Sequence, residues 1–219
     1  WEWAFYLFGM VGILWIFAWQ KWVTTLPEQH PTISAGELEH IRNNAATSGT
    51  IKETPPFGMF LRNKAVWAII VAHFCNNWTL YVILSWLPKY VNEGLGIAFA
   101  AVGIVSMLPH ITSFLCLNIA GNIADRLIVS GMDVTRVRKL MQTVAFGGLA
   151  ICLFAIGHVD SAWAAIGILC LGKLFGAAGT GGFAVNHMDI GPRHAGTLMG
   201  ITNTAGTIPG IVGVYVSGL

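Results

Sequence analysis

Charge is the property that this sequence lacks most. Its 219 residues include only 12 Lys or Arg and 10 Asp or Glu, a share of 10%, whereas soluble domains carry about 25% charged residues. The net charge of +2 leaves no basic patch, so we exclude a nucleic-acid-binding surface. The four cysteines lie inside apolar runs without CxxC spacing, and there they act as small hydrophobes.

What the sequence has instead is long apolar runs. Apolar residues make up 55% of the chain, and the mean hydropathy is +0.66. A helix needs about 20 apolar residues to cross a bilayer. We predict six transmembrane helices, at 3–23, 65–87, 97–124, 139–158, 161–184 and 195–217. The fold class is therefore all-α, that of a polytopic membrane protein in contact with the lipid bilayer.

The placement of Lys and Arg predicts which loops face the same side. Ten of them fall in loops on one side: Lys21, Arg42, Lys52, Arg62, Lys64, Arg126, Arg136, Arg138, Lys139 and Arg193. Lys89 lies on the other side, and Lys173 lies within a span. By the positive-inside rule, the loops Pro27–Lys64, Asp125–Lys139 and Asn186–His194 face the cytosol, or the stroma or matrix of an organelle.

The long polar loop at 24–64 separates the first span from the others. Ser34 followed by Glu37 predicts a helix start within it, because a serine side chain can cap the first helical turn. Pro55 and Pro56 are expected to end this short helix before the second span. We interpret the segment 24–64 as a linker on the cytosolic or stromal side.

Lys173 is the most costly residue for a membrane to accommodate. It lies about 12 residues from one end of the span 161–184, so at about 1.5 Å per residue the interface is some 16–18 Å away. A lysine side chain reaches roughly 6 Å. No predicted span contains Asp or Glu, so the ammonium needs an acid outside this chain or an anionic ligand. The alternative is a shifted span that places Lys173 near one end.

Polar residues also follow one face of the second span. His73, Asn77 and Tyr81 are spaced i, i+4 and i+8, with Asn76 beside them. Such residues can line a cavity, or they can only join neighbouring helices. His110, next to Pro109, is a candidate proton site, although a histidine bonded to a neighbouring helix fits equally well.

Small residues crowd the last two spans. The fifth span has Gly172 and Gly176 at the spacing that lets helices approach closely. The sixth span repeats this crowding and also contains the breaker Pro209; its glycines are Gly196, Gly200, Gly206, Gly210 and Gly213. Flexible helices beside a buried cation favour a transporter over a static anchor. No HExxH motif, intramembrane aspartate pair or serine–histidine arrangement is present, so we predict no enzyme, no catalytic residue, no metal site and no cofactor.

Two motifs resemble known transporters. Gly121-Asn-Ile-Ala-Asp125-Arg126 followed by Arg136-Val-Arg138-Lys139 resembles the G-x-x-x-D-R…R-K loop motif of the major facilitator superfamily. The stretch 184–206, with Asn186-His187 and Asp189, is similar to its anion/cation symporter family, which contains vesicular glutamate transporters, sialin, sodium–phosphate cotransporters and plastid phosphate transporters. Further stretches lean toward the plant and algal plastid branch: 70–78, 85–90 and 137–142.

The resemblance implies a twelve-helix fold of which this chain supplies the sixth to eleventh helices. Residues 1–23 would be the last helix of the N-terminal half-bundle, 24–64 the linker, and 65–219 the C-terminal half-bundle (helices seven to eleven). The missing N-terminal half would be a partner within the same protein. Glutamate-transporting members carry an arginine where this sequence has Asn76, so the resemblance does not favour glutamate as the substrate.

The leading hypothesis is a secondary active transporter of inorganic or organic anions, with phosphate first, that works by alternating access. Na⁺, H⁺ or the membrane potential would drive it, in a plastid membrane (thylakoid or inner envelope) or another membrane. We assign substrate contact to Lys173, Asn76, Asn77 and Tyr81, a proton or polar relay to His73 and His110, and gating to Asp125, Arg126, Arg136 and Arg138. The alternative is a structural or accessory subunit of a larger membrane complex.

Overall fold

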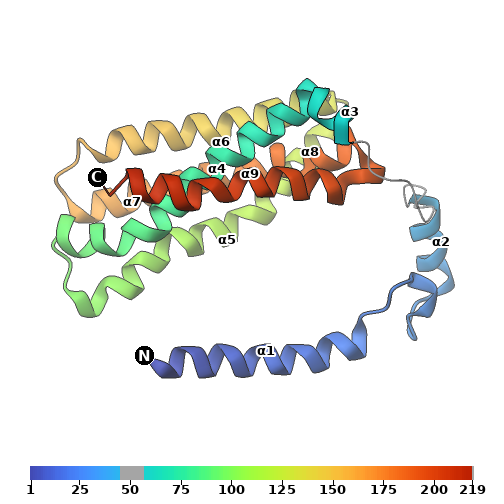
Figure 1. Ribbon diagram of the computed structural model, residues 1–219, viewed down its shortest axis with the longest axis horizontal. Coiled ribbons are helices and arrows are strands. Elements are labelled where there is room, and N and C mark those ends of the chain that lie inside the picture. Colours follow the sequence, from blue (N-terminus) through green and yellow to red (C-terminus); the bar gives the residue numbers. More distant parts are fainter. Residues whose placement is uncertain (45–56, 219) are drawn as a thin grey trace. The chain divides into compact units, whose positions relative to one another are not determined.

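The computed structural model describes residues 1–44 and 57–218, and every regular element among them is helical (Figure 1). The chain divides into two units between Ile51 and Lys52, within the predicted linker 24–64. The elements in chain order are α1 Glu2–Trp22, η1 Pro27–Gln29, α2 Ala35–Asn44, α3 Phe57–Arg62, α4 Lys64–Lys89, η2 Tyr90–Gly94, α5 Phe99–Val129, α6 Val134–Ile156, α7 Ala162–Ala177, η3 Ala178–Thr180, α8 Phe183–Ile190, η4 Pro192–His194 and α9 Ala195–Val216.

The first unit holds one long apolar helix and one short polar helix. No residue of α1 is buried, although its composition suits a membrane span. The α2 helix starts as the sequence predicts, because Ser34 Oγ accepts a hydrogen bond from the Glu37 amide at 3.2 Å. Arg42 then ties α2 to η1 by donating to Glu28 Oε1 at 2.8 Å, and this bond lowers the pKa of the Glu28 carboxyl. Pro55 and Pro56 lie outside the described residues.

Five helical segments of the described chain are long and apolar enough to cross a membrane. They are α1, α4 with η2, α5, α6, and α7 with η3 and α8. The sixth predicted span, 195–217, is the 22-residue helix α9, which does not reach the same apolarity. Its glycines and the threonines Thr197, Thr202, Thr204 and Thr207 lower its hydropathy. The six predicted helices are therefore all present, with α9 as the most polar.

Helix pairs build the second unit. α4 packs along α9, and α7 packs against both α5 and α6 (Figure 1). Where α5, α6 and α7 meet, small side chains such as Ala124, Ala145 and Ala177 form a close-packed cluster. Leu198 of α9 is buried against Val66 and Ile70 of α4. These packed pairs decide which face of each helix remains available to line a cavity.

The loop predicted at 125–139 is much shorter in the structure. α5 continues to Val129 and α6 begins at Val134, so Asp125 and Arg126 are helical, as are Arg136 and Arg138. Asp133 caps α6, because its carboxylate accepts from the Arg136 amide at 3.1 Å. The prediction was wrong here because it ended each helix at the last uncharged residue, whereas the helix continues until a cap ends it.

The predicted span 161–184 and the predicted loop 186–194 also need correction. α7 ends at Ala177, the turn η3 follows, and α8 runs from Phe183 to Ile190, so much of the predicted loop is helical. Gly181 and Gly182 form the break between α7 and α8. A Cβ atom on Gly181 would lie 2.7 Å from the Ala124 Cβ, so the chain passes too close to α5 for any larger residue.

Glycine also permits the close approach of α9 to α4. A Cβ atom on Gly206 would lie 2.9 Å from both Asn77 Nδ2 and His73 Cδ2, whereas one on Gly200 would meet nothing within 4 Å. We expect Gly206→Ala to reduce the free energy of unfolding by about 1–3 kcal/mol through overpacking. Thermal unfolding of the full-length protein in detergent measures this. Gly200→Ala is the matched control on the same helix, and equal melting temperatures for the two variants would contradict the tight α4–α9 packing.

Candidate functional site

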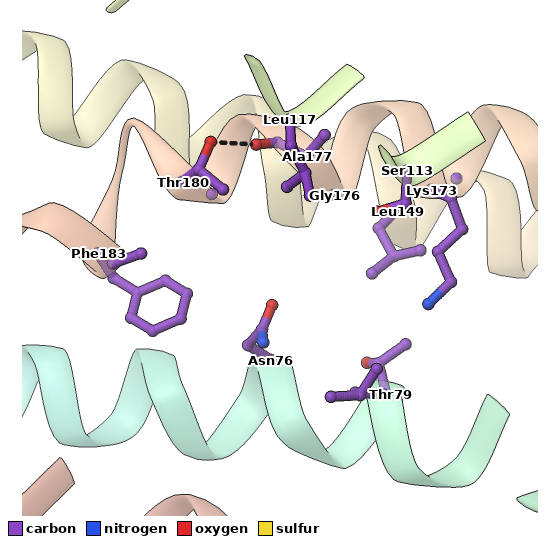
Figure 2. A pocket seen from close by; sticks show the side chains of 14 residues that line it. Asn76, Thr79, Ser113, Leu117, Leu149, Lys173, Gly176, Ala177, Thr180 and Phe183 are labelled. Atoms are coloured by element: carbon purple, nitrogen blue, oxygen red, sulfur yellow. Dashed lines mark hydrogen bonds between the residues drawn. The ribbon is translucent and has the colours of Figure 1, made fainter. Parts of the chain in front are cut away.

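A cavity of about 250 Å³ opens between α4, α5 and the broken helix α7–α8. Its polar lining comes from Asn76 and Thr79 of α4, Ser113 of α5, Lys173 of α7 and Thr180 of η3 (Figure 2). Its apolar lining includes Leu117, Leu149 and Phe183. A few convergent polar groups in an apolar cavity are typical of a small-molecule site.

Lys173 extends its ammonium group into this cavity toward α4 (Figure 2). The preceding residue, Gly172, lies against α6, where a Cβ atom would be 3.1 Å from Leu149 Cδ1. Because successive residues turn by about 100° around a helix, Lys173 then points away from α6. Within the described residues, no carboxylate lies within salt-bridge distance of the lysine. The cavity therefore holds a cation without a partner in the described part of the chain.

Asn76 presents its amide to the same cavity from α4 (Figure 2). Its Nδ2 donates to Asn77 Oδ1 at 3.2 Å, and Asn77 Nδ2 in turn donates to the Gly206 carbonyl of α9 at 2.9 Å. Among the described residues, Asn76 uses one of its two amide hydrogens, so the second can donate to a ligand. Asn77 thus holds Asn76 in position while it contacts α9 itself.

The structure divides the polar residues predicted on α4 into two sets. Asn76 lines the cavity, whereas Asn77 and Tyr81, also predicted to bind substrate, lie in the contact with α9. A Cβ atom on Gly210 would be 3.3 Å from the Tyr81 ring. His73 lies on the α9 side too, with Nδ1 at 3.1 Å from Thr202 Oγ1. The cavity therefore brings together Lys173 and Asn76, but not Asn77 or Tyr81.

Sequence reasoning missed Thr79, Ser113 and Thr180. Thr79 is three residues after Asn76, so helical periodicity could have identified it. Ser113 and Thr180 come from other helices, and no local pattern marks them as neighbours of Lys173. Thr180 lies just before the break between α7 and α8, where its hydroxyl donates to the Ala177 carbonyl at 2.8 Å (Figure 2).

His110, the second residue predicted in a proton relay, lies on α5 and is only half-buried. It does not line the Lys173 cavity, so the structure does not bring it together with Asn76.

The four predicted gating residues lie where α5 ends and α6 begins. Asp125, Arg126 and Arg136 are exposed, and none of the three forms a salt bridge within the described residues. Arg138 differs, because its Nε donates to Asp189 Oδ2 at 2.7 Å and its Nη1 to the Gly181 carbonyl at 3.1 Å. Arg138 therefore fixes α8 and the break before it onto α6.

A second cavity, of about 430 Å³, lies beside this ion pair. Gln142 of α6 supports the same break, since its Oε1 accepts from the Phe183 amide at 3.0 Å. Phe183 lines both cavities. Arg138 and Gln142 of α6 thus hold the segment that contains Phe183, and Phe183 lies between the Lys173 cavity and the second cavity beside Arg138.

We expect Asp189→Asn to destabilise the protein by about 1–3 kcal/mol, because it leaves the largely buried Arg138 guanidinium without its counter-charge. The Arg138 side chain is 14% exposed, whereas Arg42 in the Glu28 pair is 60% exposed. Glu28→Gln is therefore the control, and we expect it to change the melting temperature little, because an ion pair exposed to solvent contributes little to stability. Thermal unfolding measures both variants, and an Asp189→Asn protein as stable as Glu28→Gln would contradict a structural role for the Arg138 pair.

The comparisons with known proteins agree with the sequence motifs. The sequence profile described as Major Facilitator Superfamily matches residues 1–214. The chain is 39% identical over 220 residues to "Probable anion transporter 1, chloroplastic" of Oryza sativa subsp. japonica, with 100% of the chain and 41% of that protein aligned.

Two Arabidopsis thaliana relatives have more specific names. The chain is 36% identical over 220 residues to "Ascorbate transporter, chloroplastic", which covers 100% of the chain and 40% of that protein. It is 35% identical over 218 residues to "Sodium-dependent phosphate transport protein 1, chloroplastic", which covers 100% of the chain and 42% of that protein. The chain thus spans about two fifths of the length of these relatives.

Proposed function

Because the chain belongs to the Major Facilitator Superfamily, we propose that the full-length protein is a secondary active transporter of a small anion. The chain is part of a multi-pass membrane protein, and its family and named relatives are transporters rather than enzymes. This agrees with the predicted absence of an enzymatic activity. The transporter hypothesis is therefore favoured over that of an accessory subunit.

The observation that supports this function most is the position of Lys173 in the cavity. A charged group inside a membrane protein is costly unless it is paired or hydrated. Since the described residues supply no carboxylate to pair with it, an anionic ligand is the simplest counter-charge. Asn76, Thr79 and Ser113 line the same cavity and can donate hydrogen bonds to the oxygens of an oxyanion.

Phosphate is our first choice of substrate, and ascorbate the second. Both present several oxygens to an ammonium group and to neutral donors, which is the chemistry that the cavity offers. Relatives named for phosphate and for ascorbate align with the whole chain. The chloroplastic names of these relatives support a plastid membrane as the location.

Transport would proceed by alternating access. The half-bundle described here would rock against the N-terminal half and expose the Lys173 cavity to each side in turn. We propose that Asp125, Arg126 and Arg136, which lie exposed at the helix ends, pair with that other half in one state and separate in the other. Arg138 would contribute less to such a gate, because it already forms an ion pair with Asp189.

Uptake into proteoliposomes tests the proposed function. The full-length protein is reconstituted, and the uptake of labelled phosphate, ascorbate and glutamate is compared under Na⁺ gradients, pH gradients and no gradient. We expect phosphate or ascorbate uptake to saturate and to exceed that of protein-free vesicles. Vesicles that take up none of the three anions, although the protein is folded, would refute the proposal.

A further inference from the structure

Two buried histidines from different helices meet at one threonine hydroxyl. His73 lies on α4, His187 on α8 and Thr202 on α9, with exposed fractions of 7%, 3% and 0%. Thr202 Oγ1 is 3.1 Å from His73 Nδ1 and 2.8 Å from His187 Nε2. None of the three residues lines the Lys173 cavity. We refer to His73, Thr202 and His187 as the histidine bridge.

The hydrogen bonds of the bridge have a single consistent direction. His187 Nδ1 is 3.2 Å from the Ala184 carbonyl oxygen, which can only accept, so Nδ1 carries the hydrogen. In a neutral ring, Nε2 is then an acceptor, and the Thr202 hydroxyl donates to it. The Thr202 oxygen in turn accepts from His73 Nδ1. The contacts of Thr202 with both rings and of His187 with Ala184 are therefore all consistent with two neutral rings.

The same arrangement accepts one additional proton without a change in the heavy-atom positions. If His187 Nε2 gains a proton, it becomes a donor to Thr202 Oγ1. The hydroxyl can then turn to the Met199 carbonyl, which lies 3.2 Å away, while its oxygen accepts from both rings. A second proton would place two imidazolium rings on one oxygen atom, which like-charge repulsion opposes.

Few charged groups surround the bridge. α9 carries no Asp, Glu, Lys or Arg. On α4, the lysines Lys64 and Lys89 lie at the two ends. On α8, Asp189 is already paired with Arg138 of α6, and Arg136 and Lys139 of α6 are exposed. On η4, Arg193 is exposed, and the His194 ring makes an edge-to-face contact with Phe60 with ring centroids 5.6 Å apart.

The bridge also contacts the lining of the cavity. The Phe183 ring lies with its centroid 5.3 Å from that of His73, and Phe183 lines the Lys173 cavity (Figure 2). One turn beyond His73, Asn77 positions Asn76, as described above. A change of charge on His73 or His187 would therefore act on two residues adjacent to the ligand.

We propose that the histidine bridge is a proton-binding site that couples proton entry to anion transport by joining α4, α8 and α9. This inference rests on the proposed transport function and adds the ion that drives it. His73 was expected to take part in a relay from the sequence alone, whereas His187 and Thr202 are assigned by the structure. The bridge holds at most one additional proton, so we expect one proton to be bound per transport cycle.

The test separates anion exchange from proton coupling. The full-length protein is reconstituted, and phosphate, ascorbate and glutamate are each measured in counterflow at equal pH and in uptake with an inward proton gradient. Thr202→Val removes the hydroxyl and keeps the volume. We expect this variant to retain counterflow, while the ratio of uptake with the gradient to uptake without it falls to about 1.

Three further variants complete the test: two control for structural damage, and the third is a second test of the proton site. Thr204→Val removes a hydroxyl that, within the described part of the chain, bonds only to the Gly200 carbonyl of its own helix, so it should keep the wild-type ratio. Thr202→Ser retains the hydroxyl and should also keep the wild-type ratio. His187→Gln cannot carry the proton, so its ratio should fall to about 1 even if Thr202→Val fails to fold. A wild-type ratio in His187→Gln, or a wild-type protein with counterflow but no response to the proton gradient, would overturn the proposal.

Absence of counterflow in the wild type would instead count against the proposed transport function. The proton site then has an independent readout in the ring NMR signals of His73 and His187. We expect the two rings to titrate together in the wild type and separately in Thr202→Val. Separate titration of both rings in the wild type would refute the bridge.

Discussion

Lys173→Met is expected to reduce anion uptake about 10- to 100-fold, because one charge-assisted hydrogen bond to a buried ligand contributes about 1.5–3 kcal/mol. The folded state should tolerate this change, since methionine removes an expensive charge and approximately preserves the volume. Lys173→Arg should keep part of the uptake, because the positive charge remains while the guanidinium is larger and planar. Uptake into proteoliposomes and thermal unfolding are measured on the same preparations.

The matched control is Lys89→Met, which removes an exposed lysine from the last turn of α4. Lys89 lies 3.8 Å from Glu93 with 58% of its side chain exposed, so its loss should leave uptake close to the wild-type rate. If Lys173 instead pairs with an acid elsewhere in the full-length protein, Lys173→Met would leave that acid buried and unpaired, and the melting temperature would fall. A stable Lys173→Met protein with wild-type uptake would end the assignment of Lys173 to the substrate.

Asn76→Asp should abolish uptake, with an effect at least as large as that of Lys173→Met. The substitution nearly preserves the shape of the side chain but places a carboxylate in the cavity that Lys173 enters. The carboxylate would pair with the ammonium and would also repel the incoming anion. Because protonation removes its charge, uptake should recover partly as the pH is lowered.

Asn76→Ser is the neutral control for this position. It keeps a hydrogen-bond donor and introduces no charge, so we expect it to lower uptake by no more than about tenfold. Uptake by both variants is measured over a range of pH with the same anions. An Asn76→Asp protein that transports at the wild-type rate would show that the anion does not pass Asn76.

The sequence by itself determined the membrane architecture and the presence of a lysine within a membrane span. Uncharged runs of about 20 residues have few alternatives to membrane helices, because backbone groups in lipid must bond within their own segment. The lack of Asp and Glu in those runs likewise marked Lys173 as a residue that needs a partner from elsewhere. The family motifs between Gly121 and Gly206 then indicated the superfamily, which the profile match confirms.

Local sequence patterns were less able to predict where helices end and what each helix face contacts. Charge alone could not show that α5 and α6 extend through Asp125 and Arg138, because caps rather than polarity end these helices. Nor could the spacing of His73, Asn77 and Tyr81 show that this face packs on α9. A polar stripe looks the same in sequence whether it faces a cavity or another helix.

Only the tertiary structure decided which residues meet. Adjacent residues on a helix point about 100° apart, so the rotation of α4 against α9 places Asn76 in the cavity and Asn77 on the neighbouring helix. The Arg138–Asp189 pair joins residues 51 apart in the chain, and the His73–Thr202 contact joins residues 129 apart. Such contacts depend on how whole helices pack, and that packing is set by buried small residues such as Gly206 rather than by any short motif.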